Sequence, residues 1–590
     1  MAAKNKPAPQ DGFFKSLSSG KYNLFVVILL GVVMYLPFLG SVGLWDPWET
    51  HYGEVAREMM VRGDYVVPYW ESGYFFSKPV LVFWIEAASM HLLGINEWAI
   101  RLHTALLAIM SLAFLYVAVS RLIGKSTGLM TALIAATSPQ FFFLAKQATM
   151  DMPFVALMTS GICCFMIAFF EDEERVRPGW LYTGYVFLAL ATLAKGLLGF
   201  MLPGAIFLLY LIFSNDWAIL KRARLLTGIV IFLIIAAPWY VYMSMYEGRD
   251  SEGKTFFQRF WIHDHFNRLG AGVHGSRGVF TFFIEQLGFG MFPWSALIPF
   301  AVIDSFKLKM SELDREKKAL LIFVIWAVGT FVLFQLSVTK FHHYIFPAIP
   351  AIAVLVAYYL DRLSKGEADN GVLVFFAAFA AFIMLARDIS LSNKVLTDLF
   401  VYNYDRPYPE FAEIKWVFPV LFTASGAAMV YFYFFGNVKR VIQVFCALAL
   451  AFSFYGVHVF YNTMSPHWSQ KYYFDTYYSQ RNAGEPIGAY LMNWRGETFY
   501  SKNAVRQLKS QGELNSFLNQ SRGRKWLIVE QNRYAGMKNS MPPEYSAATK
   551  IIDRSCNKFY LVLVDDVQPR YQYQYQRGGP GEKFEGGAPE

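Results

Sequence analysis

Apolar stretches long enough to cross a membrane recur along the first 460 residues of this chain. A transmembrane helix needs roughly 20 predominantly apolar residues, and in lipid its backbone hydrogen bonds must be made within the segment. Of the 590 residues, 55% are hydrophobic and 16% are charged, whereas soluble domains carry about 25% charged residues. The sequence therefore predicts an all-α, polytopic membrane bundle.

About thirteen stretches have the composition of membrane spans. They lie near residues 23–40, 99–120, 127–145, 153–170, 180–194, 197–213, 225–246, 280–303, 319–337, 344–360, 371–387, 416–435 and 440–460. The first stretch follows a polar, basic segment without a cleavage site, which favours a retained span over a signal peptide. We therefore expect a transmembrane domain over residues 1–460, with a long outer loop at 41–98.

The character of the chain changes after Tyr461, where polar residues, turn residues and short β-like runs replace the apolar stretches. Two such runs cover residues 526–530 and 559–564. We expect a small, soluble α/β domain over residues 461–567 and a disordered tail over 568–590, which is rich in Gln, Tyr, Gly and Pro. The four cysteines have no spacing typical of a disulfide framework or a zinc site.

Basic residues fall in the loops that follow even-numbered spans. They are Arg121, Lys125, Arg175, Arg177, Lys221, Arg222, Arg224, Lys307, Lys309, Arg315, Lys317, Lys318, Arg362, Lys365, Lys439 and Arg440. The positive-inside rule places these loops and the N-terminus in the cytoplasm. The first loop, the turns near Asp151 and Lys195, loop 247–279, turn 338–343 and the soluble domain then face outward. The net charge of +9 thus reflects topology, and nothing in the sequence indicates nucleic-acid binding.

The first outer loop carries two acids, Asp46 and Glu49, in the run from Trp45 to Glu49. Pro47 stands where a helix can begin, and the apolar residues after Glu49 have helical spacing. We expect a short amphipathic helix in the membrane interface here, followed by a second one over residues 80–93. Solubility alone does not explain two acids placed next to two tryptophans, so this segment is the leading candidate for function.

Further ionisable side chains are expected on the same outer face. They are Glu54, Arg57, Glu58, Lys78, Asp151, Lys195, His263, Asp264, His265, Arg268, Lys340, His342 and His343, with Tyr344 beside them. Charged groups near apolar segments are costly unless they are paired or face a cavity, and they mark functional sites by default. Structural alternatives exist for several of them. Glu54, Arg57 and Glu58 suit a solvated helix face or local ion pairs, and Lys195 suits a snorkelling anchor.

Several segments resemble the GT-C class of membrane glycosyltransferases, in the group that contains the lipid A aminoarabinose transferases and the dolichyl-phosphate-mannose protein mannosyltransferases. The segments that carry the resemblance are residues 43–59, 63–68, 76–79 and 97–102, with weaker matches at 150–154, 194–196, 237–240, 260–269 and 336–347. Their order and spacing hold over roughly residues 20–360. The resemblance implies a helical membrane bundle that transfers a sugar from a polyprenyl-phosphate carrier.

The resemblance also implies roles for individual residues. The first-loop acid of such enzymes is the catalytic carboxylate or lies near a metal, and this role falls on Asp46 or Glu49. Relatives commonly carry Asp-Glu in the loop, but Trp48 stands in place of that Asp here, so the base is open between the two acids. The other implied roles are Asp151 as a second acid, and Lys78, Lys195, Arg268 and Tyr344 as carrier-phosphate contacts. From their place on the same outer face, we further predict that Arg57, His265, Lys340 and His343 are substrate contacts.

These residue types suit transfer from a lipid phosphate. Cations stabilise a leaving phosphate, and a carboxylate can deprotonate an acceptor hydroxyl. We therefore predict an inverting glycosyltransferase in a bacterial inner membrane, acting on the periplasmic face with a lipid, glycan or protein as acceptor. Carboxylates and histidines could hold a divalent cation, although no ligand spacing defines a site. Two alternatives stay open, a lipid-linked oligosaccharide ligase and a membrane transporter or flippase.

Overall fold

The computed structural model describes residues 22–172, 175–267, 279–307, 313–369, 371–401, 407–410, 416–520 and 523–567. The chain divides into two compact units. The first contains residues Met1–Asp475, Trp494–Asn503 and Ser555–Lys558; the second contains Thr476–Asn493, Ala504–Arg554 and Phe559–Glu590. The second unit thus begins later than the predicted boundary at Tyr461. The predicted disordered tail, 568–590, lies outside the described residues.

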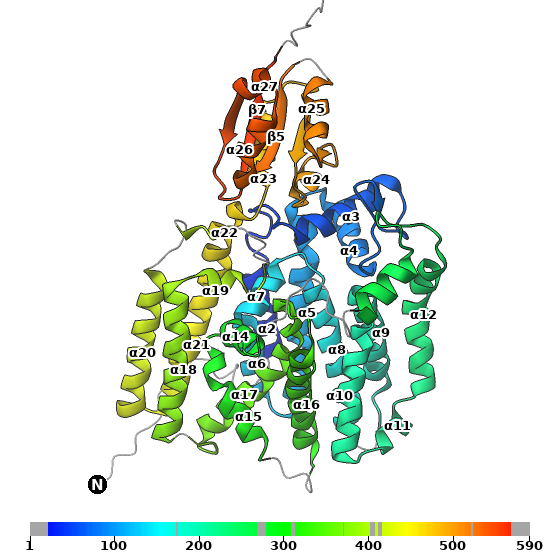
Figure 1. The fold of residues 1–590 in the computed structure, drawn as a ribbon. Helices are drawn as coiled ribbons and strands as arrows, with labels where there is room; N and C mark the ends of the chain where they lie inside the picture. The colour runs from blue at the N-terminus through cyan, green and yellow to red at the C-terminus, as the bar shows by residue number, and fades with distance from the viewer. Residues whose placement is uncertain are drawn as a thin grey trace, which may run out of the picture. The chain divides into compact units, whose positions relative to one another are not determined.

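The first unit is helical, and each predicted apolar span coincides with a helix or a pair of helices (Figure 1). The long and medium helices are α2 (Asn23–Tyr35), α5 (Glu97–Leu122), α6 (Lys125–Thr137), α7 (Pro139–Lys146), α8 (Asp151–Phe170), α9 (Pro178–Lys195), α10 (Leu198–Ser214), α12 (Leu225–Met245), α14 (Phe282–Gly290), α15 (Ile298–Ser305), α16 (Arg315–Leu336), α17 (Ile349–Lys365), α18 (Val372–Leu391), α20 (Val417–Phe435) and α21 (Val438–Tyr455). The predicted helical bundle is therefore present.

Among the described residues, eight helices are long and apolar enough to cross a membrane, or up to ten if two bent pairs each count as one span. One bent pair is α6 and α7, which meet at 65°. Ser138 separates them in an extended conformation, because the residue before a proline, here Pro139, is disfavoured in the α region. The other pair is α14 with residues 294–305, which meet at 116°. The count of about thirteen spans stays a prediction.

Short elements connect the spans. They are α3 (Trp48–Arg62), β1 (Tyr69–Trp70), β2 (Gly73–Tyr74), α4 (Leu81–Leu93), α11 (Ala218–Arg222), α19 (Lys394–Thr397), α22 (Tyr461–Met464) and α24 (Gly496–Tyr500), with the π-helices η1 (Phe257–Asn267) and η6 (Gly456–Phe460) and the 3₁₀ turns η2 (Trp294–Leu297), η3 (His342–Tyr344), η4 (Phe346–Ala348) and η7 (Ser465–His467). The two predicted helices of the first outer loop are thus present as α3 and α4.

Helix α3 differs from the predicted amphipathic surface helix. Every residue from Glu49 to Met59 is buried, including Glu54, Arg57 and Glu58. Of the two structural alternatives for these three residues, the solvated face is therefore wrong, because other parts of the unit cover the helix over this stretch. The local ion pairs are present, from Arg57 to Glu54 and to Glu58. Charged side chains buried in this way must be paired.

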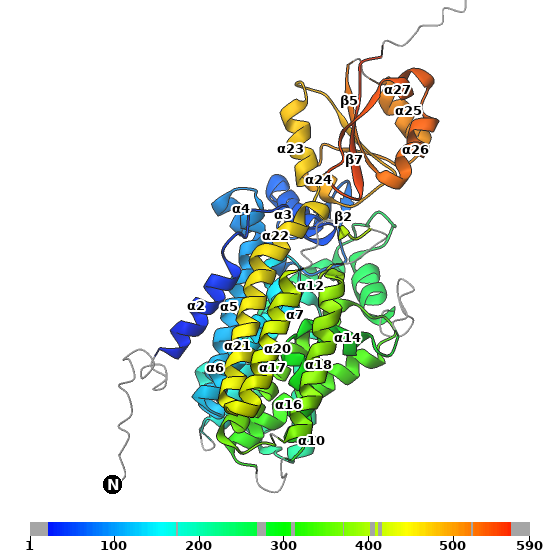
Figure 2. The ribbon, with the colours of Figure 1, turned by 90° about the vertical axis from the view of Figure 1, so that its left-hand side faces the viewer.

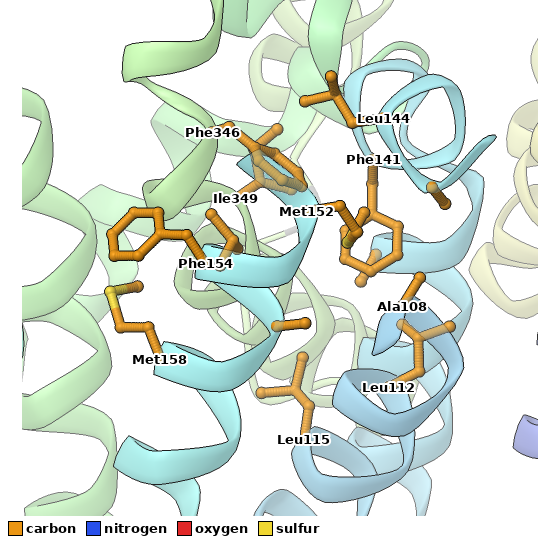
Figure 3. Close-up of a cluster of buried hydrophobic side chains, with 14 of the residues drawn as sticks. Ala108, Leu112, Leu115, Phe141, Leu144, Met152, Phe154, Met158, Phe346 and Ile349 are labelled. Carbon is orange, nitrogen blue, oxygen red and sulfur yellow. The ribbon is translucent and has the colours of Figure 1, made fainter. Parts of the chain in front are cut away.

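The core of the first unit surrounds α8, which is buried along nearly its whole length. Figure 3 shows Met152, Phe154 and Met158 of α8 among side chains from α5, α7 and the start of α17. The other labelled residues are Ala108, Leu112, Leu115, Phe141, Leu144, Phe346 and Ile349. Because α8 is enclosed by its neighbours, both of its ends are held in fixed positions relative to them.

The second unit contains a five-stranded sheet of order β4-β3-β5-β7-β6. Its strands are β3 (Ile487–Tyr490), β4 (Arg506–Leu508), β5 (Lys525–Glu530), β6 (Thr549–Asp553) and β7 (Phe559–Val564), and its helices are α25 (Gln511–Asn519), α26 (Gln531–Ser540) and α27 (Pro543–Ala547), while α23 (Lys471–Gln480) crosses from the first unit. Strand β3 is parallel to β4 and β5, whereas β7 is antiparallel to β5 and β6. Figure 2 shows α25 and α26 beside the sheet. The small C-terminal α/β structure and its strands at 526–530 and 559–564 are as predicted.

Candidate functional site

Three predicted site residues from separate elements converge at one end of the bundle. Asp151 is the first residue of α8, Lys195 is the last residue of α9, and His343 belongs to η3. The ammonium group of Lys195 forms a salt bridge with Asp151 Oδ1, and His343 Nε2 lies 3.9 Å from the same oxygen. All three side chains keep a small exposed fraction, between 13% and 18%. The cluster therefore combines an acid, a cation and an imidazole that a substrate can reach.

The position of Asp151 is favourable for a carboxylate. The first turn of an α-helix carries a partial positive charge, which stabilises an anion there. Phe154 lies one turn further along α8, and the Lys195 ammonium stands 5.5 Å from its ring centroid. The lysine is thus held between a carboxylate and an aromatic face.

Lys78 and Tyr344 extend this cluster. The positive charge of Lys78 acts on both His343 and His51, so it lies within electrostatic range of each imidazole. Tyr344 contacts the ring of its neighbour His343 at a centroid distance of 4.9 Å and that of Phe334 at 5.5 Å. Two of the four predicted carrier-phosphate residues, Lys195 and Tyr344, thus contact members of the cluster directly, and Lys78 is near it.

Glu49 takes part in a buried ion pair with Arg101. Its Oε1 accepts hydrogen bonds from Arg101 Nε at 2.8 Å and from the Ala148 amide at 2.7 Å; its Oε2 accepts from Arg101 Nη2 and from the Trp45 amide, both at 2.7 Å. Glu49 and Arg101 are fully buried. Four donors in a closed environment indicate that this carboxylate holds the first loop in place.

Asp46 is also enclosed. Its two carboxylate oxygens accept hydrogen bonds from Thr50 Oγ1 and Gln470 Nε2, both at 3.0 Å, and the residue is 2% exposed. Gly496 covers it so closely that a Cβ there would stand 2.4 Å from Asp46 Oδ1. Gln470 also donates to Glu497 Oε2 at 2.6 Å. Asp46 therefore belongs to a buried network that ties the first loop to residues near 470 and 496.

Arg57 joins two acids on α3. It donates from Nε and Nη2 to the Glu54 carboxylate, both at 2.7 Å, and from Nη2 to Glu58. Burial raises the pKa of Glu54 from the usual 4.5 to about 7, against the opposing effect of Arg57. One guanidinium shared by two buried carboxylates leaves an excess negative charge, which favours a proton on one of them.

The remaining predicted residues are dispersed. Lys340 Nζ donates to the Gln335 carbonyl at 2.8 Å and stands 5.0 Å from the Phe283 ring centroid; its burial lowers its pKa. Arg268 and the side chain of His265 lie outside the described residues. Over the described ranges, no group of three or more His, Cys, Asp or Glu side chains could hold a metal ion. The divalent cation stays a prediction.

Sequence reasoning did not single out Arg101, Gln470 or Arg495 as partners of the first loop. Arg101 stood within a family-like segment, which could have indicated a role. Gln470 and Arg495 carry no local signal, because they lie more than 400 residues from the side chains that they contact. Only the packing of the chain brings them to α3.

The sequence of this chain is similar to those of several known proteins. The family described as dolichyl-phosphate-mannose-protein mannosyltransferase matches residues 77–242. The undecaprenyl phosphate-alpha-4-amino-4-deoxy-L-arabinose arabinosyl transferase of Edwardsiella ictaluri is 27% identical over 373 residues, which cover 61% of this chain and 65% of that protein. The protein of the same name from Photorhabdus laumondii is 25% identical over 446 residues, covering 73% and 75%. The match to the Edwardsiella protein thus spans slightly less than two thirds of its length.

A solved structure shows the same fold. The crystal structure of ArnT from Cupriavidus metallidurans bound to undecaprenyl phosphate superposes with a TM-score of 0.72 at 21% identity, covering 92% of this chain and 97% of that one. This chain therefore has the fold of that protein. Its sequence resembles the aminoarabinose transferases and the mannosyltransferase family, which confirms the resemblance predicted from its motifs.

Proposed function

We propose that the chain is an inverting glycosyltransferase that takes its sugar from a polyprenyl-phosphate donor. The observation that carries the proposal is the contact of Lys195 and His343 with Asp151. These residues come from three elements that lie far apart in the sequence, and each had been assigned a role in the same reaction. The names of the arabinosyl transferase relatives support the donor class.

The geometry suits a single displacement at the sugar. The acceptor oxygen forms a bond to the anomeric carbon while the bond from that carbon to the carrier phosphate oxygen breaks. The acceptor proton passes to the carboxylate of Asp151, and the electron pair of the broken bond leaves with the polyprenyl phosphate. Lys195 and Lys78 stabilise the charge that develops on this leaving group. One displacement inverts the anomeric configuration.

The two ends of α8 support the predicted sidedness. Asp151 begins the helix, and at its other end Arg121 and Arg177 pair with Glu171, while Arg222 donates to the Phe169 carbonyl. A helix of 20 residues is roughly 30 Å long, which is the thickness of the bilayer core. The acid cluster and the basic loops thus lie one membrane thickness apart. We infer that the cluster faces the periplasm, in a chain with about thirteen spans and a cytoplasmic N-terminus.

The experiment follows label from a panel of radiolabelled polyprenyl-phosphate monosaccharides to extracted envelope lipids, glycans and proteins, with purified protein in lipid. Asp151→Asn is expected to lower transfer by about 100-fold or more, since a positioned base contributes about 10² to 10⁴ in rate. Asp388→Asn is the matched control, because Asp388 is a partly exposed aspartate in an ion pair with Arg387. If Asp151→Asn transfers sugar at the rate of the control variant, Asp151 is not the base of the reaction.

The same panel tests the alternatives. A ligase for lipid-linked oligosaccharides would use only oligosaccharide carriers, so no single-sugar donor would react. A transporter or flippase would move the carrier across the membrane of proteoliposomes without forming a product. The acceptor is a lipid, a glycan or a protein, and the fraction of envelope extract that takes up label identifies which.

A further inference from the structure

A second group of side chains lies on and around α3, and the reaction above does not use it. Its centre is His51, which is 3% exposed. The imidazole stacks on Trp70 at a centroid distance of 4.6 Å and packs against Phe75 at 4.5 Å. Among the described residues, neither ring nitrogen of His51 has a hydrogen-bond partner. Buried polar atoms are nearly always satisfied, so this imidazole indicates a missing ligand group.

Arg495 is held beside this histidine by two tryptophans. Its guanidinium stands 4.5 Å from the Trp48 ring centroid and 5.9 Å from that of Trp70. A guanidinium in a cation–π contact carries N–H groups in its plane that can also donate hydrogen bonds. Trp48 and Trp70 are both partly exposed. The group therefore offers aromatic surface next to hydrogen-bond donors.

The backbone around Arg495 is strained, and contacts of its two neighbours hold it in place. Arg495 has a φ of +77°, a left-handed conformation that is unfavourable for a residue other than glycine. The neighbouring Trp494 amide donates to Glu497 at 2.9 Å, and Gly496 packs on Asp46. Backbone strain that surrounding contacts maintain is concentrated at ligand-binding sites.

The charges near the group limit the kind of ligand. Burial keeps the pKa of His51 well below its usual range, and the positive charges of Arg495 and Lys78 lower it further, so the imidazole is neutral. A neutral imidazole can both donate and accept a hydrogen bond. A metal ion does not suit two nearby cations. A polyprenyl chain would leave the polar groups unsatisfied, and a bare phosphate would not need the aromatic rings.

We propose that Trp48, His51, Trp70 and Arg495 bind the sugar ring of the donor, next to the phosphate that Lys78 contacts. The apolar face of a sugar ring stacks on tryptophan, while its hydroxyls pair with the imidazole and the guanidinium. The charge of Lys78 acts on both His51 and His343, which links this group to the cluster that the proposed reaction uses. This inference rests on the proposed function and specifies its donor subsite.

Equilibrium binding of two radiolabelled probes to the full chain in lipid tests the proposal. One probe is undecaprenyl phosphate, and the other is the undecaprenyl-phosphate monosaccharide that the wild-type chain binds most tightly. His51→Phe keeps the aromatic packing and removes the nitrogens, and Arg495→Gln removes the cation. Each variant is expected to weaken binding of the sugar-bearing probe by about tenfold, the effect of roughly one lost hydrogen bond, and to leave undecaprenyl phosphate binding unchanged.

Arg481→Gln is the matched control, because Arg481 also lies over aromatic rings, 4.9 Å from Tyr477 and 4.6 Å from Tyr478. Equal weakening of the binding of both probes would overturn the proposal, because the group would then bind the phosphate that the two probes share. Unchanged binding of both, or a change confined to acceptor KM in the transfer assay, would overturn it as well. Binding needs no turnover, so sugar-dependent binding without transfer would instead count against the proposed reaction.

Discussion

Arg101 shows how one buried side chain organises the first outer loop. Its guanidinium donates to the Glu49 carboxylate and to the carbonyls of Leu39, Val42 and Gly43. These bonds use all five of its N–H groups. A lysine has only three donors and no planar fork, so it could not replace this arginine. We interpret Glu49 as the fixed partner that this arrangement requires.

This interpretation predicts that Glu49→Gln destabilises the fold. Removing one partner of a buried ion pair costs about 3–5 kcal/mol, because the remaining charge is uncompensated. Thermal unfolding of Glu49→Gln in detergent should therefore occur at a markedly lower temperature than that of the wild-type chain. The control is Glu171→Gln, which breaks partly exposed pairs with Arg121 and Arg177 and should cost about 1 kcal/mol or less for each pair. A stable but inactive Glu49→Gln would instead support Glu49 as the catalytic base.

The raised pKa of Glu54 predicts a pH-dependent stability. Up to about pH 7 the folded chain holds a proton on Glu54 that an unfolded carboxyl releases near 4.5. The folded state therefore binds more protons between these values, and the free energy of unfolding falls as pH rises from 4.5 to 7. Thermal unfolding across this range should show the fall, and Glu54→Gln should flatten it. The same slope in both proteins would mean that another group titrates.

At the scale of elements, the turn between α9 and α10 fixes the position of Lys195. Gly196 has a φ of +94°, which allows the chain to reverse directly after the lysine. Gly199 packs against the backbone of α9, where a Cβ would stand 2.3 Å from the Thr192 nitrogen. The absence of side chains at these two positions brings the helices close enough for Lys195 to reach Asp151.

Gly199→Ala is therefore expected to force α9 and α10 apart, to lower thermal stability and to reduce transfer with it. Gly204→Ala is the control in the same helix, because nothing lies within 4 Å of a Cβ built there; alanine is the better helix former, so this variant should be neutral or slightly stabilising. Thermal unfolding and sugar transfer, measured on both variants, test this expectation. Normal behaviour of Gly199→Ala would show that the turn can relax.

At the scale of the whole molecule, the proposed orientation places Ser251 on the periplasmic side of the membrane and Ala218 on the cytoplasmic side. Both residues are exposed. We expect a membrane-impermeant maleimide to label Ser251→Cys in intact spheroplasts and Ala218→Cys only after lysis, in a chain whose four native cysteines are replaced by alanine. The opposite labelling pattern would invert the topology and place the Asp151 cluster on the cytoplasmic side.

The sequence alone determined the helical membrane class, the approximate ranges of the helices, the start of α3 and two strands of the C-terminal sheet. These features follow from local composition and periodicity, which a stretch of neighbouring residues carries by itself. The sequence did not show that Asp151, Lys195 and His343 converge, because no local pattern indicates which loops meet.

Tertiary structure decided the environment of each charged residue. It paired Glu49 with Arg101 across 52 residues, connected Asp46 with Gln470 across 424, and buried the acids of α3 that local pattern assigned to a solvated face. The free energy of a charge depends on what surrounds it in space, and side chains from distant segments supply these surroundings. The residue types of the site could thus be read from the sequence, whereas their division between buried networks and an accessible cluster depends on how the helices pack.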